Sequence, residues 1–196
     1  MEHWATGRHR RGPHRFQPAH RRSNVPVIEA RTVVRAPPDA VFDLLVDFPG
    51  YAGYSEYLQS VDRRGSGGAG TRYRLEFGWW RFSYAVRSEV LAVERPHRID
   101  WQIVDGLDAQ GFWRVEDASD AREKPASRIV FRVSYAPGTA DLGRLDLPRV
   151  VSLETVVDRL RPVIEAEVER VVERVVADLE GTRRSVSVTV ETDPDG

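Results

Sequence analysis

The chain has 196 residues, 41% of them hydrophobic, which suffices for one domain with a real core or at most two small domains. It contains no cysteine, which excludes disulfides, thiol catalysis and zinc–thiolate sites and fits a cytoplasmic protein. The net charge is −1, and no apolar run approaches the roughly 18–20 residues that a membrane-spanning helix needs.

Residues 1–24 are expected to form a disordered basic tail. They contain six arginines against one glutamate, so the tail carries +5 and the rest of the chain −6. A negatively charged body argues against a dedicated nucleic-acid binder, so we expect no nucleic acid as a partner. The tail could touch RNA or make transient contact with an anionic membrane, although a merely solvated tail explains it more simply. Its histidines are irregularly spaced, which argues against a metal site.

A strand and a short helix are expected next. Val27–Arg35 alternates weakly between apolar and polar residues, which predicts the strand. Pro38 suits the first position of the helix because no backbone N–H donor is needed there. An apolar stripe at helical spacing predicts its buried face, formed by Val41, Leu44, Leu45 and Phe48. Pro49-Gly50 is expected to end this helix, which therefore spans Pro38–Phe48.

Aromatic residues gather directly after this helix. Tyr51, Tyr54 and Tyr57 are spaced by three, so a second short helix could show them on one face. A tyrosine combines a large apolar ring with a polar tip, which suits the mouth of a cavity. Simple packing against the sheet explains the same residues equally well, so both interpretations stay open.

A glycine-rich run, Gly65–Gly70, matches the dinucleotide-binding pattern G-x-G-x-x-G. That pattern needs a helix after the glycines, because the N-terminus of the helix holds the pyrophosphate. Alternating residues typical of a strand follow instead, starting at Arg72. The run therefore predicts a hairpin turn.

From Leu58 to Tyr135 the apolar residues mostly alternate with polar ones. This predicts a run of antiparallel strands with one wet face and one covered face. The side chains expected on the covered face are Tyr73, Leu75, Phe77, Trp79, Phe82, Tyr84, Val86, Ser88, Ile99, Trp101, Ile103, Trp113, Val115, Ile129, Phe131, Val133 and Tyr135. They include no acid, base or histidine, so we expect no metal site and no cofactor.

The end of the chain switches to helical periodicity. Leu153–Leu179 carries an apolar stripe over about seven turns, with a kink or break expected at Pro162 and a C-cap at Gly181. Arg183–Glu191 alternates again and is either an added edge strand or a frayed tail. The predicted organisation is a tail at residues 1–24, one domain at residues 25–181, and a C-terminal tail at residues 182–196.

A curved sheet around a long helix can enclose a cavity, and large aromatic side chains on the covered face favour a lined pocket over a solid core. The predicted ligand contacts come from the sheet, the segment before it and the last helix: Tyr54, Tyr73, Leu75, Phe77, Trp79, Phe82, Tyr84, Val86, Trp101, Trp113, Phe131, Val133, Leu160, Ile164 and Val168. A plain core explains part of this set.

Three stretches resemble the helix-grip fold of the START-like, or SRPBCC, superfamily, and within it the coenzyme Q-binding and polyketide cyclase/dehydrase branch. They are Val33–Leu45, Asp47–Tyr57 and Asp105–Trp113, in which Gly111 precedes a strand that carries Trp113. The resemblance covers about residues 27–180. It implies an α+β fold with a curved antiparallel sheet of six to seven strands around a long C-terminal helix, and two short helices after the first strand.

The chain departs from that family in its basic tail, the Gly138–Pro148 link and the strand-like C-terminus. Members of the branch bind lipids, isoprenoid quinones and polyketides under the long helix, so the resemblance implies a hydrophobic small molecule as ligand.

Three functions remain open. An inward face without titratable groups favours a noncatalytic binder or carrier of a lipid, isoprenoid quinone or polyketide-like molecule. An aromatase/cyclase or dehydrase would need an acid or base, for which Tyr84, Tyr73 and Tyr135 are weak candidates. The third is a ribosome- or protein-interaction role through the basic tail, as in other members of the branch. The sequence does not indicate the oligomeric state.

Overall fold

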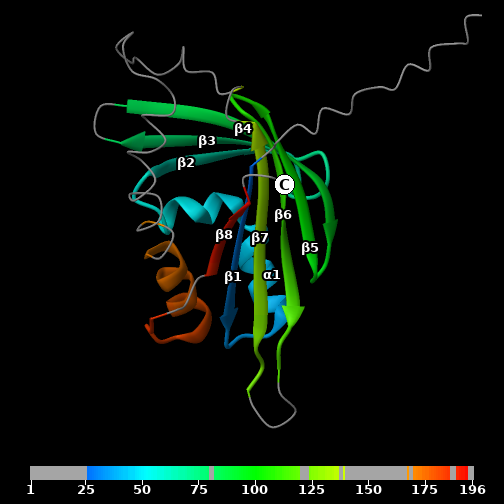
Figure 1. Cartoon of the computed structure of the whole chain (residues 1–196), viewed down its shortest axis with the longest axis vertical. Coiled ribbons are helices and arrows are strands. Elements are labelled where there is room, and N and C mark those ends of the chain that lie inside the picture. Colours follow the sequence, from blue (N-terminus) through cyan, green and yellow to red (C-terminus); the bar gives the residue numbers. More distant parts are fainter. Residues whose placement is uncertain are drawn as a thin grey trace, which may run out of the picture.

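The computed structural model describes residues 26–79, 82–119, 124–136, 139, 167, 170–185 and 189–193. Within these residues the chain forms a curved antiparallel sheet, two short helices after the first strand and a helix towards the C-terminal end (Figure 1). This is the helix-grip-like α+β fold that the sequence predicts. The basic tail, the Gly138–Pro148 link apart from Thr139, and Pro162 lie outside the described residues.

The described part of the sheet has eight strands in the order β2-β3-β4-β5-β6-β7-β1-β8. The strands are β1 (Val27–Val34), β2 (Leu58–Arg64), β3 (Arg72–Trp79), β4 (Phe82–Glu94), β5 (Arg98–Asp105), β6 (Asp108–Asp117), β7 (Ser127–Ala136) and β8 (Thr189–Asp193). The helices are α1 (Pro38–Val46) and the 3₁₀ helix η1 (Phe48–Gly53), and residues 167 and 170–180 are also helical. The sheet exceeds the predicted six to seven strands because β8 pairs with β1.

α1 ends at Val46, two residues before the predicted end at Phe48. Pro49 explains the early end, since proline has no N–H to donate to the carbonyl oxygen of Leu45, four residues earlier. The Asp47 N–H instead donates to the Leu44 carbonyl oxygen at 3.3 Å, and the tighter η1 begins at the next residue.

The three tyrosines after α1 do not share one helical face. Tyr51 lies within η1, Tyr54 follows the end of η1, and Tyr57 lies in the bend before β2. Tyr51 donates its hydroxyl proton to the Leu45 carbonyl oxygen at 2.5 Å, whereas Tyr54 donates to Asp178 on the C-terminal helix at 2.7 Å. These tyrosines therefore join α1 and the C-terminal helix to the segment before β2.

The glycine run is a turn between β2 and β3, as predicted. Gly65, Gly67 and Gly70 have φ values of +128°, +100° and +80°, which glycine adopts without steric cost. The Gly67 N–H donates to Thr71 Oγ1 at 2.9 Å, and β3 begins at the next residue, Arg72. The match to the dinucleotide pattern is thus a hairpin connection.

The helical segment 170–180 packs on the concave side of the sheet. Val176 is fully buried there, and Val172 and Leu179 pack against the same cluster. Its other buried members come from β1, α1, η1 and the sheet interior: Val34, Ala36, Val41, Phe42, Leu45, Phe48, Tyr73, Val90, Ile99, Val115 and Ile129. Tertiary packing must hold this helix, because valine is a weak helix former. Within the described ranges, no helix is both long and apolar enough to cross a membrane.

Two sets of contacts cover the outer edge of β1. β8 pairs with its residues Val27–Arg31. Further along, Arg184 Nη2 donates to the Val33 carbonyl oxygen at 3.1 Å, and the Arg35 N–H donates to Glu180 Oε1 at 2.8 Å. Glu180 and Arg184 also pair with each other at 2.7 Å. An open edge strand is a template for pairing with other chains, so these contacts close the edge within one chain.

Glu180→Gln is predicted to remove a pH-dependent part of the stability. The hydrogen bond from Arg184, with a further one from the Arg35 N–H, holds the pKa of the Glu180 carboxyl below its ordinary value. A lowered folded-state pKa stabilises the fold above the ordinary glutamate pKa of about 4.3, and this contribution is lost as the pH falls through the folded-state value. By urea denaturation, the wild type should exceed the variant at about pH 7, and the difference should shrink towards about pH 3.

Glu173→Gln is the matched control, since Glu173 is exposed on the same helix. It should show no comparable trend with pH. An equal difference between wild type and Glu180→Gln at both pH values would contradict an electrostatic role for Glu180.

Candidate functional site

Six aromatic side chains form a continuous row across the concave face. In order of contact they are Trp101 on β5, Phe131 on β7, Trp113 on β6, Tyr51 and Phe48 in η1, and Tyr73 on β3. Neighbouring ring centroids lie 5.9, 4.5, 6.5, 5.2 and 4.8 Å apart in that order. These distances lie within the range of favourable aromatic pairs. We call this set the aromatic row.

Burial divides the aromatic row in two. At one end Tyr73 is 1% exposed and belongs to the core cluster that the C-terminal helix covers. At the other end Trp101, Trp113 and Phe131 are half-buried, and so is Val133, the next inward residue of β7. We call these four residues the concave surface. It combines apolar area with partial accessibility and has no charged member, which suits a wall that binds apolar molecules.

The place of Trp101 depends on a glycine in the neighbouring strand. Gly111 lies opposite Trp101 in the register of β5 and β6. A Cβ atom at Gly111 would lie 2.7 Å from Trp101 Cζ2 and 2.2 Å from the Arg132 carbonyl oxygen. Both distances are shorter than non-bonded atoms adopt, so the indole ring occupies space over β6 that a side chain would fill.

Each end of the aromatic row carries a buried polar atom without a hydrogen-bond partner in the described part of the chain. The two atoms are Tyr73 Oη and Trp101 Nε1. A buried polar group without a partner costs free energy, so in a native fold it calls for an explanation such as a bound molecule. The hydroxyl of Tyr51, in the middle of the row, is satisfied by the Leu45 carbonyl oxygen.

The phenols near the site remain protonated at neutral pH. Burial, then the Asp178 carboxylate that accepts its hydrogen bond, raises the pKa of Tyr54 to about 12. Burial also raises the pKa of Tyr51 and Tyr73, and nearby Asp47 adds to both shifts. These hydroxyls can therefore donate hydrogen bonds but are poor bases. In the described ranges, no three acidic or histidine side chains gather as a metal site would require.

Other predicted ligand contacts lie in varied surroundings. Tyr84 donates its hydroxyl proton to the Gly106 carbonyl oxygen at 2.6 Å, which ties β4 to the turn between β5 and β6. Leu75 packs against the core cluster and Val86 is buried beside it in the register of β3 and β4. Phe77 is 36% exposed. These residues adjoin the concave face without forming one enclosed group.

For five of the residues predicted to contact the ligand, the structure does not describe the side chain. The side chains of Trp79, Phe82, Leu160, Ile164 and Val168 lie outside the described part. For two of them the backbone is placed, since Trp79 pairs with Phe82 where β3 adjoins β4. Tyr135 is half-buried near the end of β7, and its N–H donates to the Pro26 carbonyl oxygen at 3.2 Å.

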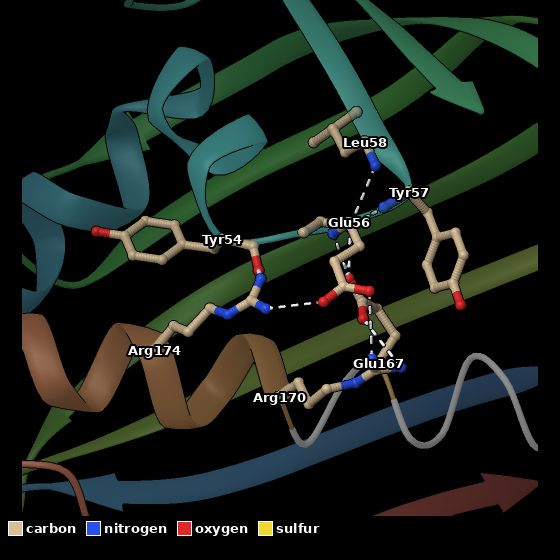
Figure 2. Close-up of polar contacts among 8 residues, drawn as sticks. Tyr54, Glu56, Tyr57, Leu58, Glu167, Arg170 and Arg174 are labelled. Carbon is tan, nitrogen blue, oxygen red and sulfur yellow. Dashed lines mark hydrogen bonds and ion pairs between the residues drawn. The ribbon is translucent and has the colours of Figure 1, made fainter. Parts of the chain in front are cut away.

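A polar cluster joins the segment before β2 to the C-terminal helix (Figure 2). Glu167, which is 8% exposed, accepts hydrogen bonds from Ser55 Oγ at 2.8 Å and from the Glu56 N–H at 2.7 Å. The Glu56 carboxylate in turn accepts from Arg174 at 3.1 Å and from Arg170 at 3.4 Å. We call these five residues the helix clasp. It fixes the C-terminal helix to the segment before β2.

The helix clasp was not among the features predicted from the sequence. Ser55 and Glu167 are 112 residues apart, and no local pattern links them. The one available signal is the spacing of Glu167, Arg170 and Arg174, which places three charged residues on one helical face. Such a face is usually solvated, so the spacing alone did not predict a buried carboxylate.

The outer face of the sheet offers a poorer surface for an apolar ligand. Two shallow hollows of about 250 and 260 Å³ lie there in the described part. Arginine–carboxylate pairs line both, with Arg87 and Asp105 at 3.3 Å in one and Arg98 and Asp100 at 2.7 Å in the other. Leu91, Trp101 and Phe112 also line the second hollow. Because charged pairs are part of both hollows and the concave surface has no charged member, the concave surface is favoured as the candidate site.

The buried hydroxyl of Tyr73 gives a stability prediction. Tyr73→Phe removes a hydroxyl without a partner among the described residues, so the free energy of unfolding should stay unchanged or rise by up to about 1 kcal/mol. Tyr51→Phe makes the same chemical change but loses the bond to Leu45, so it should lower the free energy of unfolding by about 1 kcal/mol. Urea denaturation measures both, and equal losses would contradict the unpaired state of Tyr73.

Solved structures share this fold. The di-domain aromatase/cyclase StfQ from the steffimycin biosynthetic pathway is 13% identical, with a TM-score of 0.57 over 82% of this chain and 52% of that chain. The Zhui aromatase/cyclase from a Streptomyces species is 16% identical, with a TM-score of 0.57 over 79% of this chain and 93% of that chain. Ara h 8.0201 is 17% identical, with a TM-score of 0.54 over 81% and 99%. The chain spans about half of StfQ, and at these identities the similarity shows the fold alone.

Comparison with curated proteins finds no match. A model of the family described as polyketide cyclase/dehydrase and lipid transport matches residues 26–180. The matched segment begins just before β1 and ends with the last helical residue, so it contains the aromatic row and the helix clasp. The chain belongs to the polyketide cyclase/dehydrase and lipid transport family.

Proposed function

We propose that this protein binds and carries a hydrophobic small molecule, such as a lipid, an isoprenoid quinone or a polyketide-like compound, on the concave side of its sheet. The concave surface carries the proposal. Its four members, Trp101, Trp113, Phe131 and Val133, are apolar, half-buried and contiguous with the core. Hydrophobic ligands are bound by apolar and aromatic walls of this kind, with a few polar atoms that fix orientation.

The size of the driving force supports reversible binding. A ligand that buries about 350 Å² of apolar surface gains about 9 kcal/mol at about 25 cal/mol per Å². The loss of translational and rotational freedom takes back much of that gain, which leaves affinity in the micromolar range. A carrier needs this balance, since it must both take up and release its cargo.

The helix clasp supports the same proposal. The described part of the C-terminal helix packs on the concave side through Val172, Val176 and Leu179, and the clasp adds polar contacts to this packing. Arg174 Nη1 donates to the Tyr54 carbonyl oxygen at 2.6 Å, in addition to its bond with Glu56. The clasp therefore holds the helix through polar groups, and none of the four residues of the concave surface is used for it.

An aromatase/cyclase or dehydrase activity is the second candidate, because two of the structures with this fold are aromatase/cyclases. Such chemistry needs a group that accepts or delivers a proton. Of the three tyrosines considered for this role, Tyr73 is buried with a raised pKa, and Tyr84 already donates to Gly106. Tyr135 remains the half-buried candidate. The concave surface itself supplies no acid or base, which favours binding without turnover.

Mass spectrometry of the protein purified from its own host is the direct test. Native spectra followed by solvent extraction should reveal a bound apolar molecule and its class. A protein that arrives empty, and that then takes up neither lipids nor quinones in titrations, would overturn the proposal.

A matched pair of substitutions tests the location of the site. Val133→Asp places a charge on the concave surface, so affinity for the extracted ligand should fall at least about tenfold, because burying an unpaired carboxylate is costly. Leu91→Asp makes a similar change at a position that is 45% exposed beside the outer hollow, and it should leave affinity unchanged. Fluorescence titration measures both.

Circular dichroism checks that the two variants fold. Where Val133→Asp does not fold, Val133→Thr changes polarity at nearly constant volume and should weaken binding by about threefold. Equal affinity of the wild type and the folded Val133 variants would place the ligand elsewhere.

A further inference from the structure

Among the described residues, one buried polar atom of the concave surface has no hydrogen-bond partner. That atom is Trp101 Nε1. The indole N–H is a donor only, so nothing except an acceptor can satisfy it. Most buried donors in native proteins have a partner, which makes this exception a candidate for a role in binding.

The indole ring is held in a defined position. It stacks on Phe131 with 14° between the ring planes, and it lies in the space left by Gly111. A Cβ atom in place of the Gly111 hydrogen would come within 2.7 Å of Trp101 Cζ2, the ring atom next to the carbon that bears Nε1. Contacts on both sides thus fix the ring plane and the direction of its N–H, and a preorganised donor binds an acceptor with less loss of entropy.

Trp101 Nε1 and the second unpaired atom, Tyr73 Oη, lie in different surroundings. Tyr73 is 1% exposed and sits within the core cluster, where its ring contacts Phe48 at 4.8 Å. Trp101 is half-buried and belongs to the part of the aromatic row that is not fully covered. A ligand on the concave surface therefore lies next to Trp101 rather than Tyr73.

We infer that Trp101 is a specificity-determining residue whose indole N–H donates a hydrogen bond to an acceptor oxygen of the bound molecule. This inference rests on the proposed function. It narrows the ligand class to apolar molecules that carry a carbonyl or comparable acceptor oxygen near an apolar body, and it disfavours pure hydrocarbons. In this arrangement the apolar body of the ligand lies against Phe131 and Val133, and its oxygen accepts the hydrogen bond from Nε1.

Two ligands of one shape test this inference. The probes are 1,4-naphthoquinone and naphthalene, which share a fused two-ring body and differ in the carbonyl oxygens. The chain contains no cysteine, so thiol addition does not remove the quinone. Equilibrium dialysis gives both affinities for the wild type, for Trp101→Phe, and for the control Trp113→Phe.

Trp101→Phe keeps an aromatic ring but removes the N–H, and its smaller volume affects both probes alike. The preference for naphthoquinone over naphthalene should therefore fall by about threefold to tenfold, the effect of one lost hydrogen bond. Trp113→Phe makes the same reduction in size at the neighbouring position of the aromatic row and should leave the preference unchanged. Since the comparison is a ratio of two ligands on one variant, a change in stability cancels.

An NMR titration of the wild type tests the inference without using the affinity of a variant. In ¹H–¹⁵N spectra of the wild type, the Trp101 indole resonance is assigned by its absence in Trp101→Phe. Both probes act on it through their ring currents, so the indole shift that reports a hydrogen bond is the downfield movement expected with naphthoquinone relative to naphthalene. Binding of both probes with an unchanged preference and no such indole shift would overturn this inference and leave the proposed function intact. Failure of the wild type to bind either probe would count against both.

Discussion

The structure depends on how one helix covers the concave face of a sheet that is wider than the helix. A helix with its side chains is about 10 Å across, and neighbouring strands lie about 4.8 Å apart, so one helix covers roughly two strands of a flat sheet. Curvature brings more strands within reach, and Val90, Ile99 and Val115 are buried in the same cluster as Val176. Beyond this region the inward residues are half-buried, which leaves the concave surface. The candidate site is therefore a geometric consequence of the fold.

Apolar packing alone does not define the position of the C-terminal helix along the sheet. Polar contacts at specific residues do. Glu167 accepts hydrogen bonds from Ser55 and from the Glu56 backbone, and its other carboxylate oxygen lies 3.4 Å from Arg170 without hydrogen-bond geometry. A buried carboxylate that lost these donors would pay a large desolvation cost, so the contacts specify one position of the helix. At the other end Glu180 performs the corresponding task against β1. The helix is thus anchored at both ends of its described part.

The sequence predicts those features whose causes are local. Alternation assigns Tyr73, Val86 and Ile99 to the covered face, because a strand side chain can point in only two directions. Contacts that join distant segments cannot be predicted from such local patterns. The helix clasp pairs residues more than a hundred positions apart, and the Arg35–Glu180 bond spans 145. The choice between an edge strand and a frayed tail for the C-terminus also depended on such contacts. The sequence shows Gly111 only as part of a motif. The structure shows why glycine is needed there, because the Trp101 ring lies across it.

The chemistry of the polar atoms along the aromatic row favours recognition over catalysis. General acid–base catalysis works best when the pKa of the group lies near the working pH, and burial moves the phenols of Tyr51 and Tyr73 further from it. The same burial strengthens a hydrogen bond that a neutral donor makes, since no water competes for it. A carrier needs donors of this kind, because they select a ligand by its acceptor oxygens without altering it. Among the described residues, an apolar wall with few neutral donors thus suits the proposed binding of an apolar ligand that carries acceptor oxygens.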